Sequence, residues 1–530
     1  MYGTGSYLGL LLILCLSYKV TGQQQSDYYV GAVVEFSPNY FRGDALATLG
    51  NNTKSYVEYI EKAKQQNADI VVFPEDGLTS TRMPTVSQMD AWSTIVPAVE
   101  DEYVPCTGNL MGVSETLKNI SCAAKHNSIY VLINIAEKER CNSTDETIYH
   151  NTNVAFDRTG KIIARYRKVN LYMEPRFRPT KIPEIVTFDT DFGVRFGTFI
   201  CFDILFWIPG LNMTRTAGVT DFLYPTAWFS EAPFLTAVQA QFGWSYAEDV
   251  NLLAAGYSNP ASGSTGSGIY LGRDGIANAT FSSHPKHRLL VSRIPKKELK
   301  KPRSEIIQER SSDLTRYTLE MTGDVVDGVY LLHDNVTLFK HIPVEPLMTQ
   351  TSLCHDGFCC HFDIRANIVK SSINYHAVVY NGIRRYGREV EAGIRVCAVI
   401  QCSDEAGISC VSVSRSDTVF NELKITTTVD DYEQVLAMPS TLNASMLPFE
   451  EWKYTNRLGT TGTNLTLELS QSAKDLVTFG LYIRNFDRDS WLSKTMETAP
   501  TVTGAGSLSN PSIINVSFFS MFLIFSLFAL

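Results

Sequence analysis

Three residues with complementary chemistry each follow an apolar stretch of the sequence. Glu75 comes after IVVFP, Lys168 after IIARYR, and Cys201 after FGTFI. A cysteine can attack an amide carbonyl, a carboxylate can take up the thiol proton, and an ammonium group can stabilise the negative charge that develops on the carbonyl oxygen. Together these residue types form a coherent candidate catalytic set, whose chemistry requires no histidine, metal or cofactor.

Taken singly, each of the three residues has an ordinary structural explanation. A glutamate after a strand is usually a solvated loop residue, a lysine beside Arg165 and Arg167 is usually a surface charge, and a buried cysteine usually packs in a core. In layered α/β folds, however, side chains just past the C-terminal ends of strands gather at one edge of the sheet. We therefore expect Glu75, Lys168 and Cys201 to meet at such an edge.

The elements that must position these residues alternate between strand and helix from residue 28 to about residue 295. A helical spacing of apolar residues predicts a helix over Thr53–Gln66, and RTG at 158–160 predicts a hairpin turn. The alternation predicts an α/β domain in which helices cover sheets. The predicted strands are Tyr29–Phe36, Ile70–Phe73, Ile129–Ile135, Asn153–Asp157, Ile162–Tyr166, Phe196–Cys201, Asp221–Tyr224 and Leu252–Tyr257.

Beyond about residue 310 the pattern changes to short β-rich runs with clustered cysteines. Tyr375–Tyr380 and Ile394–Ile400 are examples of these runs, which predict a smaller, mostly β domain. The clustered cysteines indicate a disulfide framework made in an oxidising compartment, with the pairing left open, and a zinc site is the less favoured alternative. The cysteines outside the apolar N-terminus and apart from Cys201 are Cys106, Cys122, Cys141, Cys354, Cys359, Cys360, Cys397, Cys402 and Cys410.

The N-terminus is typical of a secretory signal peptide. Tyr7–Tyr18 is apolar but too short to span a bilayer, and Val20–Gly22 offers a small-residue cleavage site. We therefore expect residues 1–22 to be removed and the protein to be extracellular. Nine glycosylation sequons agree with this expectation: Asn51, Asn119, Asn142, Asn212, Asn278, Asn335, Asn443, Asn464 and Asn515.

The C-terminus is typical of a glycosylphosphatidylinositol (GPI) attachment signal over residues 504–530. Ser517–Leu530 is apolar and no basic residue follows it, which is unusual for a membrane-spanning helix with a cytoplasmic flank. A short stop-transfer helix is the alternative. In both cases we expect the protein at the outer cell surface, and in the favoured case a lipid anchor in the outer leaflet, attached near Gly504, Ala505, Gly506 or Ser507.

Composition narrows the class of protein further. The chain has 530 residues, 44% of them hydrophobic, which suffices for two or three globular domains. A net charge of −9 disfavours nucleic acid as a partner. The expected partner is a small amide substrate, and the sequence predicts no oligomeric state.

The contexts of the three polar residues resemble known motifs. VFPEDG around Glu75, RKVNLY around Lys168, and CFDILF with YPTAW after Cys201 resemble the Glu, Lys and Cys motifs of the nitrilase superfamily. CFDILF together with TGSGIY at 265–270 is similar to the vanin and biotinidase branch. The resemblance implies an αββα sandwich over residues 23–305 and a β-rich base domain over residues 306–495, in a secreted, glycosylated and often lipid-anchored enzyme.

Carried over to this sequence, the resemblance gives each residue a role. Cys201 is the nucleophile, Glu75 the general base and acid, and Lys168 the electrostatic partner of the oxyanion, together with the backbone N–H of Phe202.

Four further residues are candidates for supporting roles. Glu174 is at a distance from Lys168 that suits the additional glutamate of many nitrilase relatives, although methionine stands where a glycine is expected before it. Asp203 is expected chiefly to orient or cap the turn after the nucleophile. Trp228 and Tyr270 are expected to line either the pocket or the core.

The resemblance implies hydrolysis of a linear amide, with two competing substrates. Pantetheine, cleaved to pantothenate and cysteamine, is favoured over biotin amides such as biocytin, because the lipid-anchor signal is more like vanins than soluble biotinidase. A catalytically silent, anchored adhesion or receptor ectodomain is the alternative from another class, and the retained glutamate, lysine and cysteine argue against it. A papain-like protease is disfavoured because its C-G-S-C-W signature is missing.

Overall fold

The computed structural model describes residues 26–491 apart from 142–145, 301–317, 320, 327, 347–349, 370–372, 388–389, 404–409 and 411–412. Among these residues, no helix is both long enough and apolar enough to span a bilayer. The predicted signal peptide, the predicted lipid-anchor signal and the sequons at Asn142 and Asn515 lie outside the described residues.

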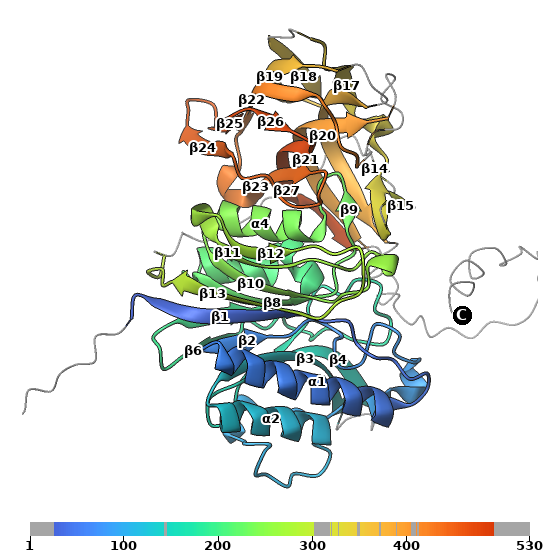
Figure 1. The fold of residues 1–530 in the computed structure, drawn as a ribbon, viewed down its shortest axis with the longest axis vertical. Helices are drawn as coiled ribbons and strands as arrows, with labels where there is room; N and C mark the ends of the chain where they lie inside the picture. Colours follow the sequence, from blue (N-terminus) through green and yellow to red (C-terminus); the bar gives the residue numbers. More distant parts are fainter. Residues whose placement is uncertain are drawn as a thin grey trace, which may run out of the picture. The chain divides into compact units, whose positions relative to one another are not determined.

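The first half of the chain contains two six-stranded sheets that pack face to face (Figure 1). One sheet has the order β13-β1-β2-β3-β4-β5 and the other β12-β11-β10-β8-β7-β6. The strands of the first are β1 (Tyr28–Glu35), β2 (Ile70–Val72), β3 (Tyr130–Arg140), β4 (Thr147–Phe156), β5 (Ile162–Arg167) and β13 (Arg288–Pro295). Those of the second are β6 (Thr187–Asp189), β7 (Arg195–Thr198), β8 (Asp221–Thr226), β10 (Asn251–Gly256), β11 (Ser267–Leu271) and β12 (Ile276–Thr280).

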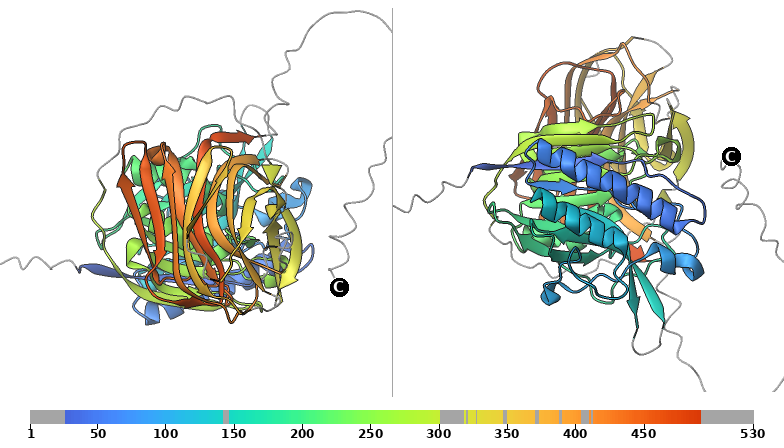
Figure 2. Two further views of the ribbon diagram at one scale, coloured as in Figure 1. Left: turned by 90° about the horizontal axis from the view of Figure 1, so that it is seen from above. Right: turned by 60° about the horizontal axis from the view of Figure 1, so that its bottom comes forward.

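Helices cover the outer faces of both sheets, which confirms the predicted αββα sandwich. Helices α1 (Ala45–Gln65) and α2 (Glu115–Asn127) lie side by side on the first sheet (Figure 2). The short α3 (Asn212–Arg215) and the longer α4 (Ala237–Glu248) belong to the second sheet's side. Because sheets covered on both faces bury both sides of each strand, their central strands are continuous apolar runs such as IVV in β2.

Helix α1 begins two turns earlier than the sequence predicts. The Asp44 side chain accepts a hydrogen bond from the backbone N–H of Ala47 and so caps the first turn. One side of the first turns carries buried polar residues, Thr48 and Asn52, and Asn52 donates to the carbonyls of Asn39 and Leu78. A buried polar face is not visible as an apolar periodicity, which is why the prediction started too late.

The second half of the chain is mostly β, as predicted, and its described residues form two large sheets and part of a small one (Figure 2). One large sheet has the order β14-β20-β21-β27-β23 with β17 added on β20, and the other β18-β19-β22-β25-β24 with β26 added on β22. The small sheet has the order β15-β16-β9, in which β16 (Val329–Asp334) pairs with β15 (Met321–Val326) and with β9 (Glu231–Ala232) of the first half. The strands of the two large sheets are β14 (Thr318–Leu319), β17 (Lys340–Pro343), β18 (Gln350–His355), β19 (Phe358–Asn367), β20 (Asn374–Tyr386), β21 (Val390–Cys402), β22 (Val419–Val429), β23 (Val435–Asn443), β24 (Trp452–Leu458), β25 (Thr463–Leu469), β26 (Ala473–Lys474) and β27 (Leu476–Trp491).

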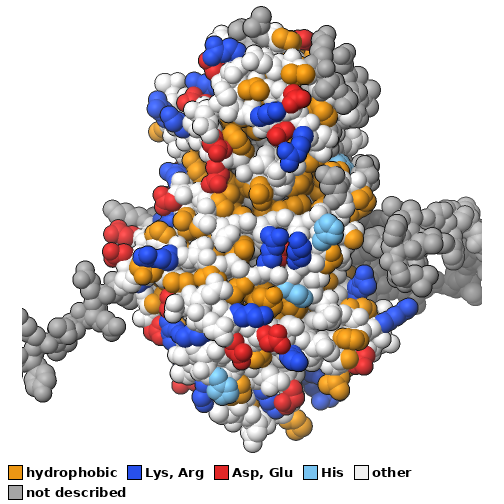
Figure 3. Space-filling view, in the orientation of Figure 1, with side chains coloured by type: hydrophobic (Ala, Val, Ile, Leu, Met, Phe, Trp, Pro, Cys, Tyr) orange, Lys and Arg blue, Asp and Glu red, His pale blue; other side chains and the backbone are white. Residues whose placement is uncertain are grey.

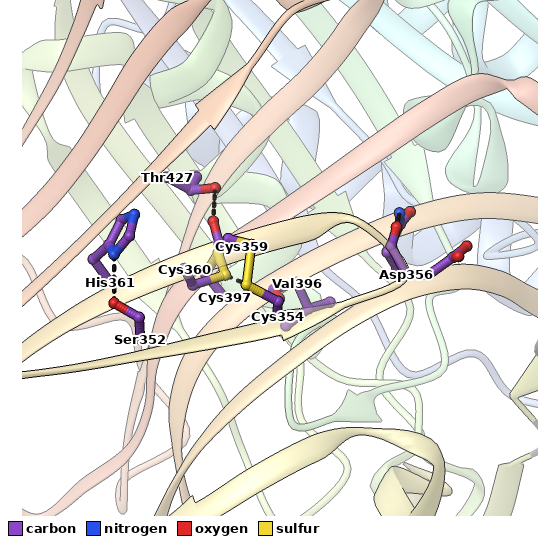
Figure 4. The surroundings of a disulfide bond; sticks show 10 residues. Ser352, Cys354, Asp356, Cys359, Cys360, His361, Val396, Cys397 and Thr427 are labelled. Carbon is purple, nitrogen blue, oxygen red and sulfur yellow. Dashed lines mark hydrogen bonds between the residues drawn. A yellow bond between two sulfur atoms is a disulfide. The ribbon is translucent and has the colours of Figure 1, made fainter.

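Disulfides rather than zinc join the clustered cysteines, which confirms the favoured prediction. The pairs are Cys106–Cys122, Cys354–Cys359, Cys360–Cys397 and Cys402–Cys410. Figure 4 shows two of them next to each other on β19, where Cys359 and Cys360 are consecutive. Consecutive strand residues point to opposite faces, so the two disulfides leave β19 on opposite sides.

The two halves share a packed junction. Helix α4 lies against β23, and the Gln239 amide donates to the Ser440 hydroxyl at 3.0 Å (Figure 1). In Figure 3, hydrophobic side chains gather at this level, while charges of both signs are interspersed over the rest of the visible face. The fully buried Arg484 of β27 donates to the carbonyl of Leu205 at 3.0 Å. The second half therefore contacts the short helix that begins with Cys201.

Glu35, at the end of β1, makes stability depend on pH. Burial raises the pKa of Glu35 to about 7, from about 4.5 in an unfolded chain. The unfolded chain loses this proton first as pH rises, so the stability that the protonated carboxyl permits is complete below about pH 4.5 and is lost by about pH 7. The shift corresponds to at most about 3 kcal/mol.

We therefore expect Glu35→Gln to reduce the fall in melting temperature between pH 5 and pH 8, measured by differential scanning fluorimetry. The amide cannot ionise but has the same size. Exposed Glu58 on α1 gives the matched control, because Glu58→Gln should leave the pH dependence as in the wild type. An identical pH dependence in the Glu35→Gln variant and the wild type would contradict the shifted pKa.

Candidate active site

The structure brings Glu75, Lys168 and Cys201 together at one edge of the two sheets. Glu75 follows β2, Lys168 is the residue after β5, and Cys201 follows β7. Their exposed fractions are 1%, 1% and 7%, so neither Glu75 nor Lys168 is the solvated charge that it might have been by itself. A buried carboxylate, ammonium and thiol in contact form a site rather than a surface.

Lys168 is at the centre of the group. Its Nζ donates to Glu75 Oε1 at 2.6 Å and to Glu174 Oε1 at 2.7 Å. Glu174, for which the sequence context departs from the family pattern, is therefore a direct neighbour of Lys168. Its other oxygen, Oε2, is buried and has no hydrogen-bond partner among the described residues.

Glu75 is held by both of its carboxylate oxygens. Besides Lys168, Oε1 accepts a hydrogen bond from Asn151 Nδ2 at 2.8 Å. Oε2 accepts one from the backbone N–H of Ala227 at 2.9 Å. The Cys201 thiol lies close enough to this carboxylate for the negative charge of Glu75 to raise the pKa of the thiol. Glu75 is thus fixed in position next to the thiol whose proton it would accept.

Cys201 is on a sharp turn rather than at the end of a strand. The predicted strand Phe196–Cys201 is wrong at its end: β7 stops at Thr198, and Cys201 begins the short helix Cys201–Leu205. Its backbone has a φ of 45°, in the left-handed region that non-glycine residues rarely adopt. A strand cannot continue through this conformation. Such strain is typical of functional sites and turns the thiol toward the edge of the sheet.

Asp203 holds this turn in place. Its Oδ2 accepts hydrogen bonds from the backbone N–H of Ile200 at 3.0 Å and from the Tyr166 hydroxyl at 2.7 Å. Its Oδ1 accepts from the backbone N–H of Asn170 at 2.9 Å. Asp203 therefore joins the segment after Lys168 to the turn of Cys201, and has the structural position that the sequence suggested.

The pKa shifts at the site determine which of its groups carry a proton. Burial raises the pKa of the Cys201 thiol well above its ordinary value, and the charge of Glu75 raises it further. Burial by itself would raise the pKa of Glu75, but Lys168 brings it below the ordinary value. Burial raises the pKa of Glu174 to about 8. The resting site consequently contains a neutral thiol beside an ionised Glu75.

Lys168 remains charged despite its burial. Burial opposes its charge, but Glu174 and Glu75 raise the pKa of Lys168 well above its ordinary value. The site thus keeps one ammonium group between two carboxyl groups.

The aromatic candidates take different positions. Trp228 is buried, and its indole N–H donates to the carbonyl of Leu235 at 2.9 Å. The ring of Phe202 packs against Tyr172 with 5.0 Å between centroids. Tyr270 donates to Gln241 of α4 and is part of the core under that helix. Phe202 is thus next to the nucleophile, whereas Tyr270 is a core residue.

Sequence reasoning missed a chain of buried asparagines that supports the site. Asn134 Nδ2 donates to Asn151 Oδ1 at 2.6 Å, and Asn151 in turn holds Glu75. Asn153 donates to the Thr198 hydroxyl at 2.8 Å, at the end of the strand that precedes Cys201. The signal was present in the sequence, because asparagine is disfavoured in strands, and Asn134 and Asn153 each lie in a predicted one.

Comparison with known proteins identifies the family. Residues 37–230 match the model of the carbon–nitrogen hydrolases, and residues 329–489 match the vanin C-terminal domain. Vanin-like protein 1 of Drosophila melanogaster is 36% identical over 91% of this chain and 90% of its own length. The chain belongs to the vanin family of carbon–nitrogen hydrolases. This membership confirms the resemblance and makes the protein an amide-hydrolysing enzyme.

Two further relatives represent the two branches of this family that the sequence resembles. The pantetheinase of Canis lupus familiaris is 30% identical over 74% of this chain and 76% of its own length. The human biotinidase is 27% identical over 92% of this chain and 96% of its own length.

The raised pKa of the Cys201 thiol has a measurable consequence. Because only the thiolate reacts with iodoacetamide, the rate of alkylation at Cys201 should rise with pH along a curve whose midpoint lies above that of a free cysteine peptide. Peptide mapping by mass spectrometry measures the rate at this residue, and the peptide in the same solution is the control. A rate that is already constant below pH 8 would mean that the resting site contains a thiolate, against the electrostatics described above.

Proposed function

We propose that this vanin-family enzyme hydrolyses the linear amide of pantetheine through a thioester on Cys201, with Glu75 as general base and acid and Lys168 as electrostatic partner. The observation that supports it best is the contact of Lys168 Nζ with Glu75 beside a free, buried thiol. A neutral thiol, an ionised carboxylate and a fixed ammonium group are the three components that amide attack needs.

In the acylation step, Glu75 takes the thiol proton as the Cys201 sulfur attacks the amide carbonyl. The negative charge that forms on the carbonyl oxygen is stabilised by the Lys168 ammonium and by the N–H of Phe202, because N–H groups at the start of a helix have no partner within the helix. Glu75 then gives its proton to the leaving nitrogen. The carbon–nitrogen bond breaks, the amine cysteamine leaves, and the acyl group remains on Cys201 as a thioester.

In the deacylation step, Glu75 accepts a proton from a water molecule that attacks the thioester carbonyl. The second tetrahedral oxyanion uses the same donors. The carbon–sulfur bond breaks, the carboxylic acid pantothenate leaves, and the proton held by Glu75 returns to the Cys201 sulfur. Each cycle consumes one water molecule and restores the resting charges.

The substrate and the setting of the enzyme are part of the proposal. Relatives named pantetheinase and the predicted lipid anchor favour pantetheine, and the relative named biotinidase makes a biotin amide the second candidate. Four disulfides favour an extracellular location. We further propose that residues 1–22 direct secretion, that 23–305 form the catalytic domain and 306–495 the base domain, and that 504–530 direct lipid anchoring at the outer leaflet.

Substitution of each of the three residues tests the mechanism. Cys201→Ser should fold and lose at least about 10³-fold in kcat, because a hydroxyl is a far poorer nucleophile at neutral pH. Lys168→Ala should lose about 10²- to 10³-fold by removing an oxyanion donor. Glu75→Gln should block both steps, and combined losses should be far from additive.

The matched control for these variants is Lys161→Ala. Lys161 lies in the same hairpin as Lys168, but its ammonium is partly exposed and pairs with Glu102 at 3.4 Å. Its substitution should leave kcat unchanged, as measured by release of cysteamine from pantetheine. Near-normal amide hydrolysis by Cys201→Ser would disprove the thioester mechanism.

A side-by-side assay decides between the substrates. We expect kcat/KM for pantetheine to exceed that for biocytin under matched conditions, measured with one preparation of the secreted ectodomain. The Cys201→Ser variant in both assays shows that each activity comes from this site. A higher value for biocytin would transfer the protein to the biotin-amide branch and leave the mechanism as proposed.

A further inference from the structure

A fully buried arginine of the C-terminal half is ion-paired with the catalytic half. Arg384 of β20 has no exposed surface, and its Nη1 donates to Glu231 Oε2 at 2.7 Å. Its Nε and Nη2 donate to Asp334 Oδ1 at 2.8 and 2.7 Å. Glu231 belongs to the catalytic half and Asp334 to β16 (Val329–Asp334) of the C-terminal half, so this ion triad joins the two halves.

Glu231 belongs to a segment that reaches the candidate active site. Residues 226–236, here called the 226–236 loop, connect the end of β8 to the start of α4. Near its start, the N–H of Ala227 donates to Glu75. Farther along, Trp228 donates to the carbonyl of Leu235, and Glu231 and Leu235 exchange backbone hydrogen bonds. The loop is therefore a closed unit that contacts Glu75 near its start and presents Glu231 from its middle.

The C-terminal half also holds this loop through the backbone. Glu231–Ala232 forms the short strand β9, which pairs with β16, and the N–H of Leu332 donates to the carbonyl of Ser230 at 3.0 Å. The pairing of β9 with β16 fixes the backbone position of the loop. The Arg384 guanidinium supplies the positive charge opposite the buried carboxylate of Glu231. Burial raises the pKa of Glu231 to about 7 even with Arg384 in place, so without this counter-charge Glu231 would be protonated or would move toward water, and in both cases the ion pair that holds the loop would be lost.

A second set of contacts leads from the same arginine to the nucleophile. The Arg384 guanidinium stacks over the Tyr386 ring at 4.3 Å from its centroid. That ring packs against Phe202 with 5.1 Å between centroids. Phe202 directly follows Cys201, and its backbone N–H is the oxyanion donor of the proposed mechanism. Arg384 thus supports both sides of the site without contacting the reacting groups.

We propose that Arg384 is a positioning residue for amide hydrolysis: through Glu231 it holds the 226–236 loop and the Ala227 N–H against Glu75, and through Tyr386 it holds Phe202 beside Cys201. The inference rests on the proposed function of Glu75 and Cys201. The C-terminal domain then takes part in catalysis, because it supplies Arg384, the cation that fixes the 226–236 loop of the catalytic domain.

The test compares variants of the secreted, full ectodomain with pantetheine as substrate. Arg384→Met should lose about 10²-fold in kcat while KM changes by less than about threefold, because misplacement by about 1 Å affects the reacting geometry more than binding. Arg384→Lys should recover a large part of the loss, since it restores the charge without the fork of donors. Rescue by charge and the split between kcat and KM separate positioning from a general loss of folded protein.

Two further variants keep the test decisive. Glu231→Gln leaves Arg384 paired with Asp334 and should fold, yet it should lose about tenfold in kcat by weakening the hold on the loop. Arg395→Met is the matched control, because Arg395 pairs with Asp431 at 2.8 Å within the C-terminal half, and it should keep wild-type kcat. If Arg384→Met does not fold, the comparison of Glu231→Gln with Arg395→Met decides.

The inference is overturned if Arg384→Met and Glu231→Gln retain kcat within about twofold of Arg395→Met. This result is distinct from a failure of the proposed function. If the mechanism itself were wrong, Cys201→Ser would remain active, whereas an inactive Cys201→Ser together with active Arg384 and Glu231 variants would contradict only the role of Arg384.

Discussion

The structure of the site depends on one buried ammonium group. Lys168 has almost no contact with water; the ionised Glu75 at 2.6 Å compensates its charge, and Glu174 accepts a second hydrogen bond from it at 2.7 Å. Removing water from a charge is costly, and only close, hydrogen-bonded partners offset the cost. The same contacts have a chemical effect, because they keep Glu75 ionised. Burial together with the negative charge of Glu75 then keeps the Cys201 thiol protonated in the resting site. The buried ion pair and the ionised state of Glu75 are thus one property.

The residues around Lys168 are also held in fixed positions by hydrogen bonds. The carboxylate of Glu75 is bound by Asn151 on one side and by the Ala227 N–H on the other. Cys201 is on a left-handed turn that Asp203 ties to the segment after Lys168. Preorganised groups lower a barrier because they need not be reoriented as charge develops. The two sheets supply the strand ends, and the C-terminal half holds the loops that follow them.

The sequence allowed the elements and the central residues to be predicted, but not the contacts between them. Cys201 and its two partners were found because their residue types suit one chemistry and each follows an apolar run. The early start of α1 at the Asp44 cap was missed, because a buried polar face has no apolar periodicity. Ala227 acts through its backbone, which has no residue-type signature. Arg384 is 153 positions from Glu231, the loop residue with which it pairs, and only the folded chain brings the two together.

The central claim is that the acyl group passes through a covalent bond to Cys201. Rapid acid quenching during turnover of pantetheine, followed by proteolysis and mass spectrometry, tests this claim directly, because a thioester survives in acid. The account predicts that the peptide containing Cys201 carries the mass of a pantothenoyl group and loses it on treatment with hydroxylamine. Turnover at a normal rate with no adduct on that peptide, or with an adduct on another residue, would contradict it.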